Sequence, residues 1–145
     1  MQADPLIQRI TLTDALKAQL ESVNAAVNND VRYVPDIVKY GRAEYWENAD
    51  KAGEEGDCED EVLAKRQRLR DLGWPQASLD VARCTDEKGE EHAVLIARTD
   101  QADMVLDNRQ NSVWRWDQLS AFGYTFQAVT VGGSLLEWRS VPEAA

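Results

Sequence analysis

Three residues of this sequence have the types and the order needed for acyl transfer through a thiol: Cys58, His92 and Asp107. Cys58 falls at the start of a helix that we predict over 57–72, where free backbone N–H groups lower the pKa of a thiol and can receive an oxyanion. His92 is the only histidine of the chain, and imidazole is the usual base that activates a cysteine. A carboxylate such as Asp107 would orient that imidazole, so the three residues predict a catalytic triad.

The spacing of His92 and Asp107 suits a β-hairpin. We predict strands over 91–98 and 103–107 joined by a turn at 99–102, and antiparallel pairing about that turn places His92 opposite Asp107, within hydrogen-bond reach. Each residue also has an ordinary explanation. A buried cysteine packs as a small hydrophobic residue, and a histidine or aspartate at a strand end is commonly structural. The residues alone leave both interpretations open.

The pattern of apolar residues predicts the elements that would position this site. A first helix is capped by Thr13, ends at 28–30 and is followed by an extended piece at 31–34. The second helix, over 57–72, is closed by Gly73. Alternating apolar residues then predict five strands, at 79–84, 91–98, 103–107, 124–131 and 135–139. Two helices followed by an antiparallel meander give an α+β fold with the N-terminal helices packed on one side of the sheet.

Several other features are expected to be structural. Trp114 and Trp116 would share one face of an extended segment, and Tyr124 would serve packing. The basic residues within 65–70 would form a solvated helix face, and the turn at 86–88 would be an ordinary exposed loop.

Length and charge bound the class of protein. With 145 residues, 43% of them hydrophobic, the chain suits a single domain over 1–145, and we expect a monomer. Its formal net charge of −10 argues against nucleic acid and anionic membrane surfaces as partners. No apolar run is long enough to insert across a membrane. The N-terminus has no signal-peptide pattern, so we expect a cytoplasmic or phage-encoded protein, periplasmic only if a signal has been removed.

The residues around the three candidates carry a family resemblance. The string Gly56-Asp57-Cys58-Glu59-Asp60, followed by His92-Ala93-Val94-Leu95 and Val105-Leu106-Asp107-Asn108, resembles the bacterial transglutaminase-like cysteine peptidases. This family includes periplasmic, calcium-dependent proteases that release large biofilm adhesins. The resemblance extends from about residue 16 to residue 126. It implies a transglutaminase-like, papain-like cysteine protease fold and acyl transfer through a thioester.

The resemblance also implies a role for each residue. Cys58 would be the nucleophile, His92 the general base and then acid, and Asp107 the group that fixes the imidazole tautomer. Trp46 would donate to the oxyanion or border the substrate groove, or else serve as a half-buried anchor. The implied function is a cysteine peptidase that hydrolyses a peptide bond in a protein or peptide substrate. Three alternatives stay open: a transglutaminase-type amine acyltransferase on the same triad, a non-catalytic binding module, and a secreted domain stabilised by a Cys58–Cys84 disulfide.

The acidic neighbours of Cys58 raise the question of calcium. Asp57, Glu59 and Asp60 would raise the pKa of the thiol, because like charges disfavour a thiolate. A bound Ca²⁺, which prefers oxygen ligands, would remove that conflict, and the resemblance points the same way. The alternative needs no metal: Asp57 is an N-cap, Asp60 completes a capping box, and Glu59 complements the helix dipole.

Overall fold

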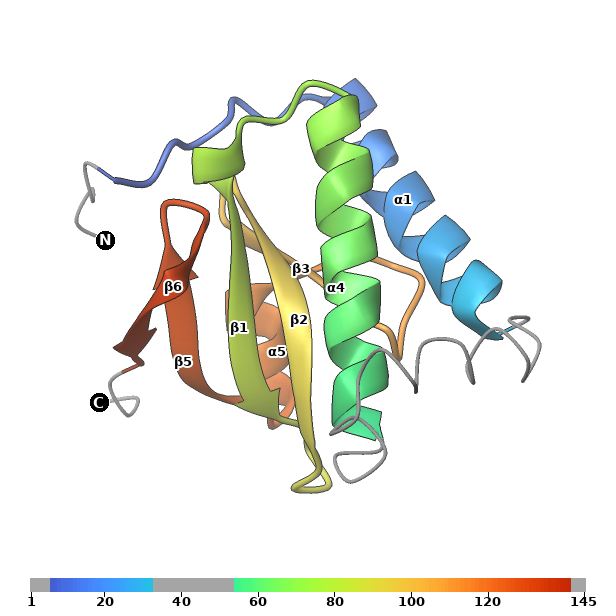
Figure 1. The fold of residues 1–145 in the computed structure, drawn as a ribbon, viewed down its shortest axis with the longest axis vertical. Helices are drawn as coiled ribbons and strands as arrows, with labels where there is room; N and C mark the ends of the chain where they lie inside the picture. The colour runs from blue at the N-terminus through green and yellow to red at the C-terminus, as the bar shows by residue number, and fades with distance from the viewer. Residues whose placement is uncertain (1–5, 33–53, 142–145) are drawn as a thin grey trace.

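Two helices pack side by side over an antiparallel sheet in the computed structural model of the chain (Figure 1). The structure describes residues 6–32 and 54–141, except for the side chains of 30–32 and 54–58. The helices are α1 (Asp14–Arg32) and α4 (Glu54–Asp71), and α4 lies along the middle of the sheet. No helix in the described ranges is long and apolar enough to cross a membrane.

The sheet has the strand order β4-β3-β2-β1-β5-β6 among the described residues, and all of its pairs are antiparallel. Its strands are β1 (Leu79–Thr85), β2 (Glu91–Arg98), β3 (Asp103–Leu106), β4 (Trp114–Arg115), β5 (Thr125–Val131) and β6 (Ser134–Ser140), and a short 3-10 helix, η1 (Gln76–Ser78), precedes β1. The first four described strands form a meander, in which β4 is a strand that was not predicted. The chain then crosses back, so that β5 pairs with β1 rather than with its predecessor, and the prediction of one continuous meander is wrong.

A helix that the sequence pattern did not predict makes this crossing. Helix α5 (Trp116–Phe122) packs its buried Leu119 on the face of the sheet opposite α1 and α4 (Figure 1). Trp116 begins this helix and stacks on Phe126 at a centroid distance of 3.8 Å, so it does not share an extended face with Trp114 as predicted. The prediction that the two N-terminal helices pack on one side of the sheet is confirmed by α1 and α4.

Both faces of the sheet are covered, and β2 divides its side chains between them. Ala93, Leu95 and Ala97 face the core beneath α1 and α4, whereas Val94 and Ile96 face the core beneath α5. A strand buried on both faces reads as a continuous apolar run, as β2 does. His92 belongs to the same alternation as Val94 and is therefore directed to the α5 side.

The start of α1 is confirmed and its end is not. The Thr13 hydroxyl accepts the Leu16 N–H at 3.2 Å, as expected of an N-cap. The helix continues through residues 28–30 to Arg32, so the predicted end is wrong, and so is the extended conformation for 31–32. Residues 33 and 34 lie outside the described ranges. Asn28 lies within the helix, and its side-chain amide donates to the Asp107 carbonyl at 3.0 Å.

Helix α4 begins at Glu54, three residues before the predicted start, and ends as predicted before Gly73, whose φ is +107°. One part of its predicted solvated basic face is wrong, because Lys65 is only 1% exposed. Buried Val62 and Leu69 instead hold the helix on the sheet.

A buried ion pair ties the strands together at the end of the sheet where β1 begins and β2 ends. Asp80 accepts hydrogen bonds from the Arg98 guanidinium at 3.0 Å, the Thr130 hydroxyl at 2.7 Å and the Gly133 N–H at 2.7 Å. Both charged groups are nearly inaccessible to solvent. Such a pair is costly to break, since removal of one partner leaves an uncompensated buried charge.

Replacing Asp80 by Ala should therefore lower the free energy of unfolding by about 3 kcal/mol. Urea denaturation followed by circular dichroism measures this change. The control is Glu137→Ala on exposed β6, which should stay within about 0.5 kcal/mol of the parent. Equal effects of the two substitutions would contradict the role given to the buried pair.

Candidate active site

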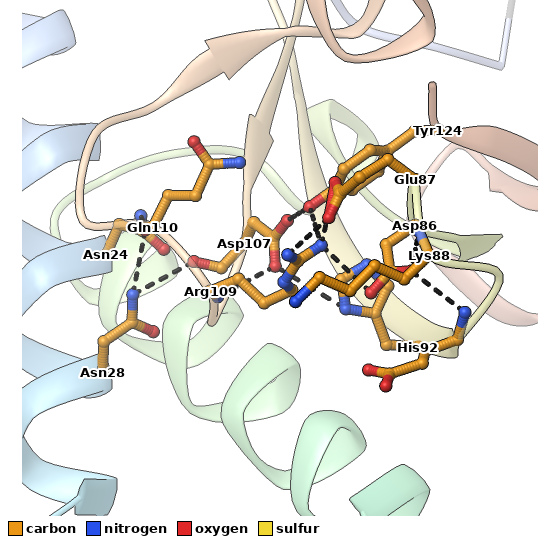
Figure 2. Close-up of polar contacts among 11 residues, drawn as sticks. Asn24, Asn28, Asp86, Glu87, Lys88, His92, Asp107, Arg109, Gln110 and Tyr124 are labelled. Carbon is orange, nitrogen blue, oxygen red and sulfur yellow. Dashed lines mark hydrogen bonds and ion pairs between the residues drawn. The ribbon is translucent and has the colours of Figure 1, made fainter. Parts of the chain in front are cut away.

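The structure brings two of the three predicted catalytic residues together. His92 is the second residue of β2, and Asp107 follows the last residue of β3. Both residues are buried, His92 with 8% and Asp107 with 1% of its surface exposed. The Nδ1 atom of His92 lies 3.7 Å from Oδ1 of Asp107 (Figure 2). This is an ion-pair distance rather than a hydrogen bond. Catalytic hydrogen bonds are often long without substrate and shorten when it binds.

The pairing between β2 and β3 differs from the predicted register by two residues. Leu95 pairs with Leu106, so an extension of the ladder by one residue puts Asp107 opposite Val94 and not opposite His92. A displacement by two keeps every side chain on its face, whereas a displacement by one would have reversed them all. Asp107 consequently approaches His92 as a diagonal neighbour on the same face.

The Asp107 carboxylate is held by groups that the sequence analysis did not single out. Its Oδ2 atom accepts a hydrogen bond from the Tyr124 hydroxyl at 2.5 Å, and Oδ1 accepts the Arg109 N–H at 3.0 Å (Figure 2). Tyr124, predicted only to pack, also places its ring 5.5 Å from the His92 ring. No local pattern signals this contact, because Tyr124 reaches the site only through the crossing made by α5.

The turn between β1 and β2 is not the ordinary exposed loop that was predicted. The Arg109 guanidinium contacts Asp86 at 3.0 Å and Glu87 at 2.5 Å, and Asp86 is only 3% exposed. The hydrogen bond to Glu87 raises the pKa of Arg109 above its ordinary value. The turn that precedes His92 is thereby fastened to the segment that follows Asp107.

Asp86 is ionised in this arrangement. Burial by itself would raise its pKa, but its carboxylate accepts the backbone N–H groups of Glu90 and Lys88 and faces Arg109 and His92. These interactions hold the pKa of Asp86 below its ordinary value.

The second nitrogen of His92 is buried without a hydrogen-bond partner among the described residues. The ring lines a pocket of about 230 Å³. Two of the other lining residues bear on the site: Cys84, which pairs directly with His92 across β1 and β2, and Glu59, which comes from α4. An imidazole nitrogen that no described residue binds can exchange a proton with a group brought beside it.

Cys58 belongs to α4, and its side chain lies outside the described part of the chain. The beginning of α4 and the beginning of β2 lie at the same end of the molecule (Figure 1). Its neighbour Glu59 lines the same pocket as His92. The sequence predicted Cys58 in the first turn of the helix. Because α4 begins at Glu54, Cys58 is instead its fifth residue. Its N–H then bonds within the helix and does not remain free for an oxyanion.

Of the three predicted calcium ligands, the structure describes the side chains of Glu59 and Asp60. Glu59 accepts a hydrogen bond from Arg83 at 3.1 Å, and both side chains are about half exposed. In the described ranges no three His, Cys, Asp or Glu side chains are grouped to hold a metal ion. The side chain of Asp57 and all of Trp46 lie outside those ranges.

Comparison with known proteins defines the class to which this fold and site belong. The sequence matches the family of bacterial transglutaminase-like cysteine proteinases (BTLCP) over residues 2–144, and the chain belongs to that family. The resemblance in the sequence is thus confirmed. None of the curated proteins matches the chain.

Two solved structures of one family relative share the fold. They are Legionella pneumophila LapG in a calcium-bound form and a second structure of LapG, each with a TM-score of 0.55. The sequences are 19% and 20% identical to this chain, and each alignment covers 79% of this chain and 64% of LapG. The predicted α+β, transglutaminase-like fold is confirmed, while the chain spans less than two thirds of the LapG chain.

Stability at low pH tests the environment of Asp86. Because the folded-state pKa of Asp86 is lowered, its carboxylate stabilises the fold above its unfolded pKa of about 3.9, and this contribution is lost as the pH falls through the lower folded value. The parent should therefore exceed Asp86→Asn in free energy of unfolding by a constant amount above about pH 5, and the difference should shrink below about pH 4. Urea denaturation of both proteins, above and below these pH values, measures the difference in free energy of unfolding. A difference independent of pH would show that the fold does not lower the pKa of Asp86.

Proposed function

We propose that this chain is a cysteine peptidase in which Cys58 is the nucleophile, His92 the general base and acid, and Asp107 the orienting carboxylate. One observation carries the proposal. The buried imidazole of His92 has Nδ1 facing a buried carboxylate and Nε2 without a partner among the described residues, and His92 lines a pocket that α4 also lines through Glu59. A base that activates a thiol needs this arrangement, with one ring nitrogen held by a carboxylate and the other available to the thiol.

The reaction follows from this arrangement. The Cys58 thiol gives its proton to His92 Nε2, and the thiolate attacks the carbonyl carbon of the peptide bond. The carbon–nitrogen bond then breaks, the leaving amine takes the proton from His92, and the acyl group remains on sulfur as a thioester. Water then gives a proton to His92 and attacks the thioester, which releases the acid and restores the thiol. The proton from Cys58 leaves on the amine, and the proton that His92 takes from water passes to the departing sulfur, so the net change is hydrolysis.

Asp107 favours the productive form of His92. Its buried negative charge near Nδ1 favours a proton on that nitrogen, which leaves the Nε2 lone pair available to the thiol. The same charge stabilises the imidazolium formed when Cys58 ionises.

The thiolate depends mainly on His92. The helix dipole acts most strongly within the first turn, so its effect at Cys58 is reduced by the early start of α4. The carboxylates of Asp57 and Asp60 oppose ionisation, whereas the charge of Glu59 is balanced by Arg83. We therefore expect the imidazolium to supply most of the stabilisation.

Alkylation of Cys58 by iodoacetamide tests the triad. Its rate should reach a plateau well below the ordinary thiol pKa of about 8.5, and His92→Ala should abolish that plateau. Asp107→Asn should lower the plateau rate by about tenfold or more, because the imidazole loses its preferred tautomer. A Cys84→Ala background removes the second thiol.

The matched carboxylate control is Asp117→Asn at an exposed position of α5, which should keep the alkylation profile of the parent. An ordinary thiol profile that is indifferent to His92 would overturn the triad and favour a binding module. Incubation with a peptide library, with and without an added primary amine, then separates hydrolysis from amide transfer by the mass of the product.

Calcium is the second part of the proposal. LapG has been solved in a calcium-bound form. In this chain Asp57 and Asp60 lie one helical turn apart and could share a cation, whereas Glu59 is directed to Arg83. A bound cation would neutralise carboxylates beside the thiolate, and no step of the reaction above passes through it.

Calcium should accordingly raise the alkylation rate of Cys58 below pH 8, and Asp60→Asn should remove that response. Glu59→Gln is the matched control and should leave the response in place, because Glu59 is directed to Arg83. No effect of calcium or of a chelator on the parent would exclude the site.

A further inference from the structure

We infer that Tyr124 is a positioning residue of this site: its hydroxyl orients the Asp107 carboxylate and thereby fixes the tautomer of His92. This inference rests on the proposed function for its consequence in catalysis. Its physical basis is independent of that function and lies in the contacts of three buried side chains.

The direction of the hydrogen bonds at Tyr124 is determined by its neighbours. The Arg109 guanidinium can only donate, and it lies 3.2 Å from the Tyr124 oxygen. The ionised Asp107 carboxylate can only accept, and it lies 2.5 Å away on the other side. The single hydroxyl proton of Tyr124 must therefore point to Asp107. Such a chain, from Arg109 through Tyr124 to Asp107, strengthens each of its bonds by polarisation.

Tyr124 keeps that proton over the working range of pH. Burial and the hydrogen bond to the Asp107 carboxylate both raise the pKa of Tyr124 well above its ordinary value. Arg109 is itself anchored to Asp86 and Glu87, so the donor on the far side is also fixed.

The geometry of the carboxylate then follows. With Oδ2 bound to Tyr124 and Oδ1 to the Arg109 N–H, the carboxyl plane cannot rotate freely, and Oδ1 stays on the side of His92 Nδ1 (Figure 2). Asp107 is 1% exposed and Tyr124 4%, so within the described residues little solvent can replace the hydroxyl. Without it, Oδ2 would be a buried acceptor seeking another donor, and the His92 imidazole lies within the same cluster.

The single histidine makes this testable without a substrate. In protein labelled with ¹⁵N-histidine, the nitrogen shifts report where the proton resides on His92 alone. The tautomers are read in a Cys58→Ala background, where no thiol can charge the ring, and there the neutral imidazole should carry its proton on Nδ1. Tyr124→Phe, which keeps the ring and removes the hydroxyl, should give a mixture of the two tautomers. It should also lower the plateau rate of Cys58 alkylation about tenfold, the size of one lost hydrogen bond to a charged group.

Thr130→Val is the matched control. It too removes a buried hydroxyl that donates to a buried carboxylate, in this case Asp80, at the far end of the sheet. It should lower stability without changing the His92 tautomer or the alkylation profile. If Tyr124→Phe also leaves both unchanged, Tyr124 has no positioning role.

If Tyr124→Phe does not fold, 3-fluorotyrosine at position 124 preserves ring and hydroxyl. Its ¹⁹F shift should remain that of the protonated phenol at a pH where free 3-fluorotyrosine has ionised, and ionisation like the free amino acid would overturn the inference. Failure of the proposed function is distinguishable from these results. If the proposed function fails, the parent shows no activated thiol. The response of the His92 tautomer to Tyr124→Phe is measured separately, and its absence overturns the positioning role.

Discussion

The burial of one carboxylate, Asp107, governs the arrangement of the site. A charge that is 1% exposed must be satisfied by hydrogen bonds or by an opposite charge, and Asp107 obtains them from Tyr124, from the Arg109 N–H and from the neighbourhood of His92. Even its carbonyl is bound, by Asn28 of α1. Elements distant in the sequence thus converge on a single residue because an unpaired charge would be too costly there.

The topology of the sheet makes this convergence possible. β2 lies in the interior of the sheet with helices over both faces, so His92 at its start is shielded from solvent although it lies near the rim. The crossing through α5 carries the chain to the opposite side of β1 and delivers Tyr124 beneath Asp107. On the other face, α4 packs along β2 and brings Glu59 to the pocket that His92 lines.

The electrostatic environment divides into two parts. Around Asp107 the groups are buried and balanced, with Arg109 joined to Asp86 and Glu87 of the neighbouring turn. Next to Cys58 in the sequence, Glu59 is nearer to solvent and is balanced by a half-exposed pair with Arg83. A half-exposed pair contributes about 0–1 kcal/mol and is easily exchanged for another partner. The proposed activity therefore combines a rigid base with a nucleophile whose surroundings can respond to ions.

The sequence by itself determined what depends on neighbouring residues. The alternation of β2 predicted a strand over 91–98, the structure has Glu91–Arg98, and the Thr13 cap, the turn before β3 and the hairpin of the last two strands follow from equally local signals. The sequence also singled out Cys58, His92 and Asp107, and it identified the family. Only the tertiary structure decided the two-residue shift of the β2–β3 register, the place of β5 beside β1, the early start of α4 and the hydroxyl of Tyr124 on Asp107. Local spacing encodes periodicity and caps, whereas these features depend on which distant surfaces bury one another and on which buried charge must find a partner.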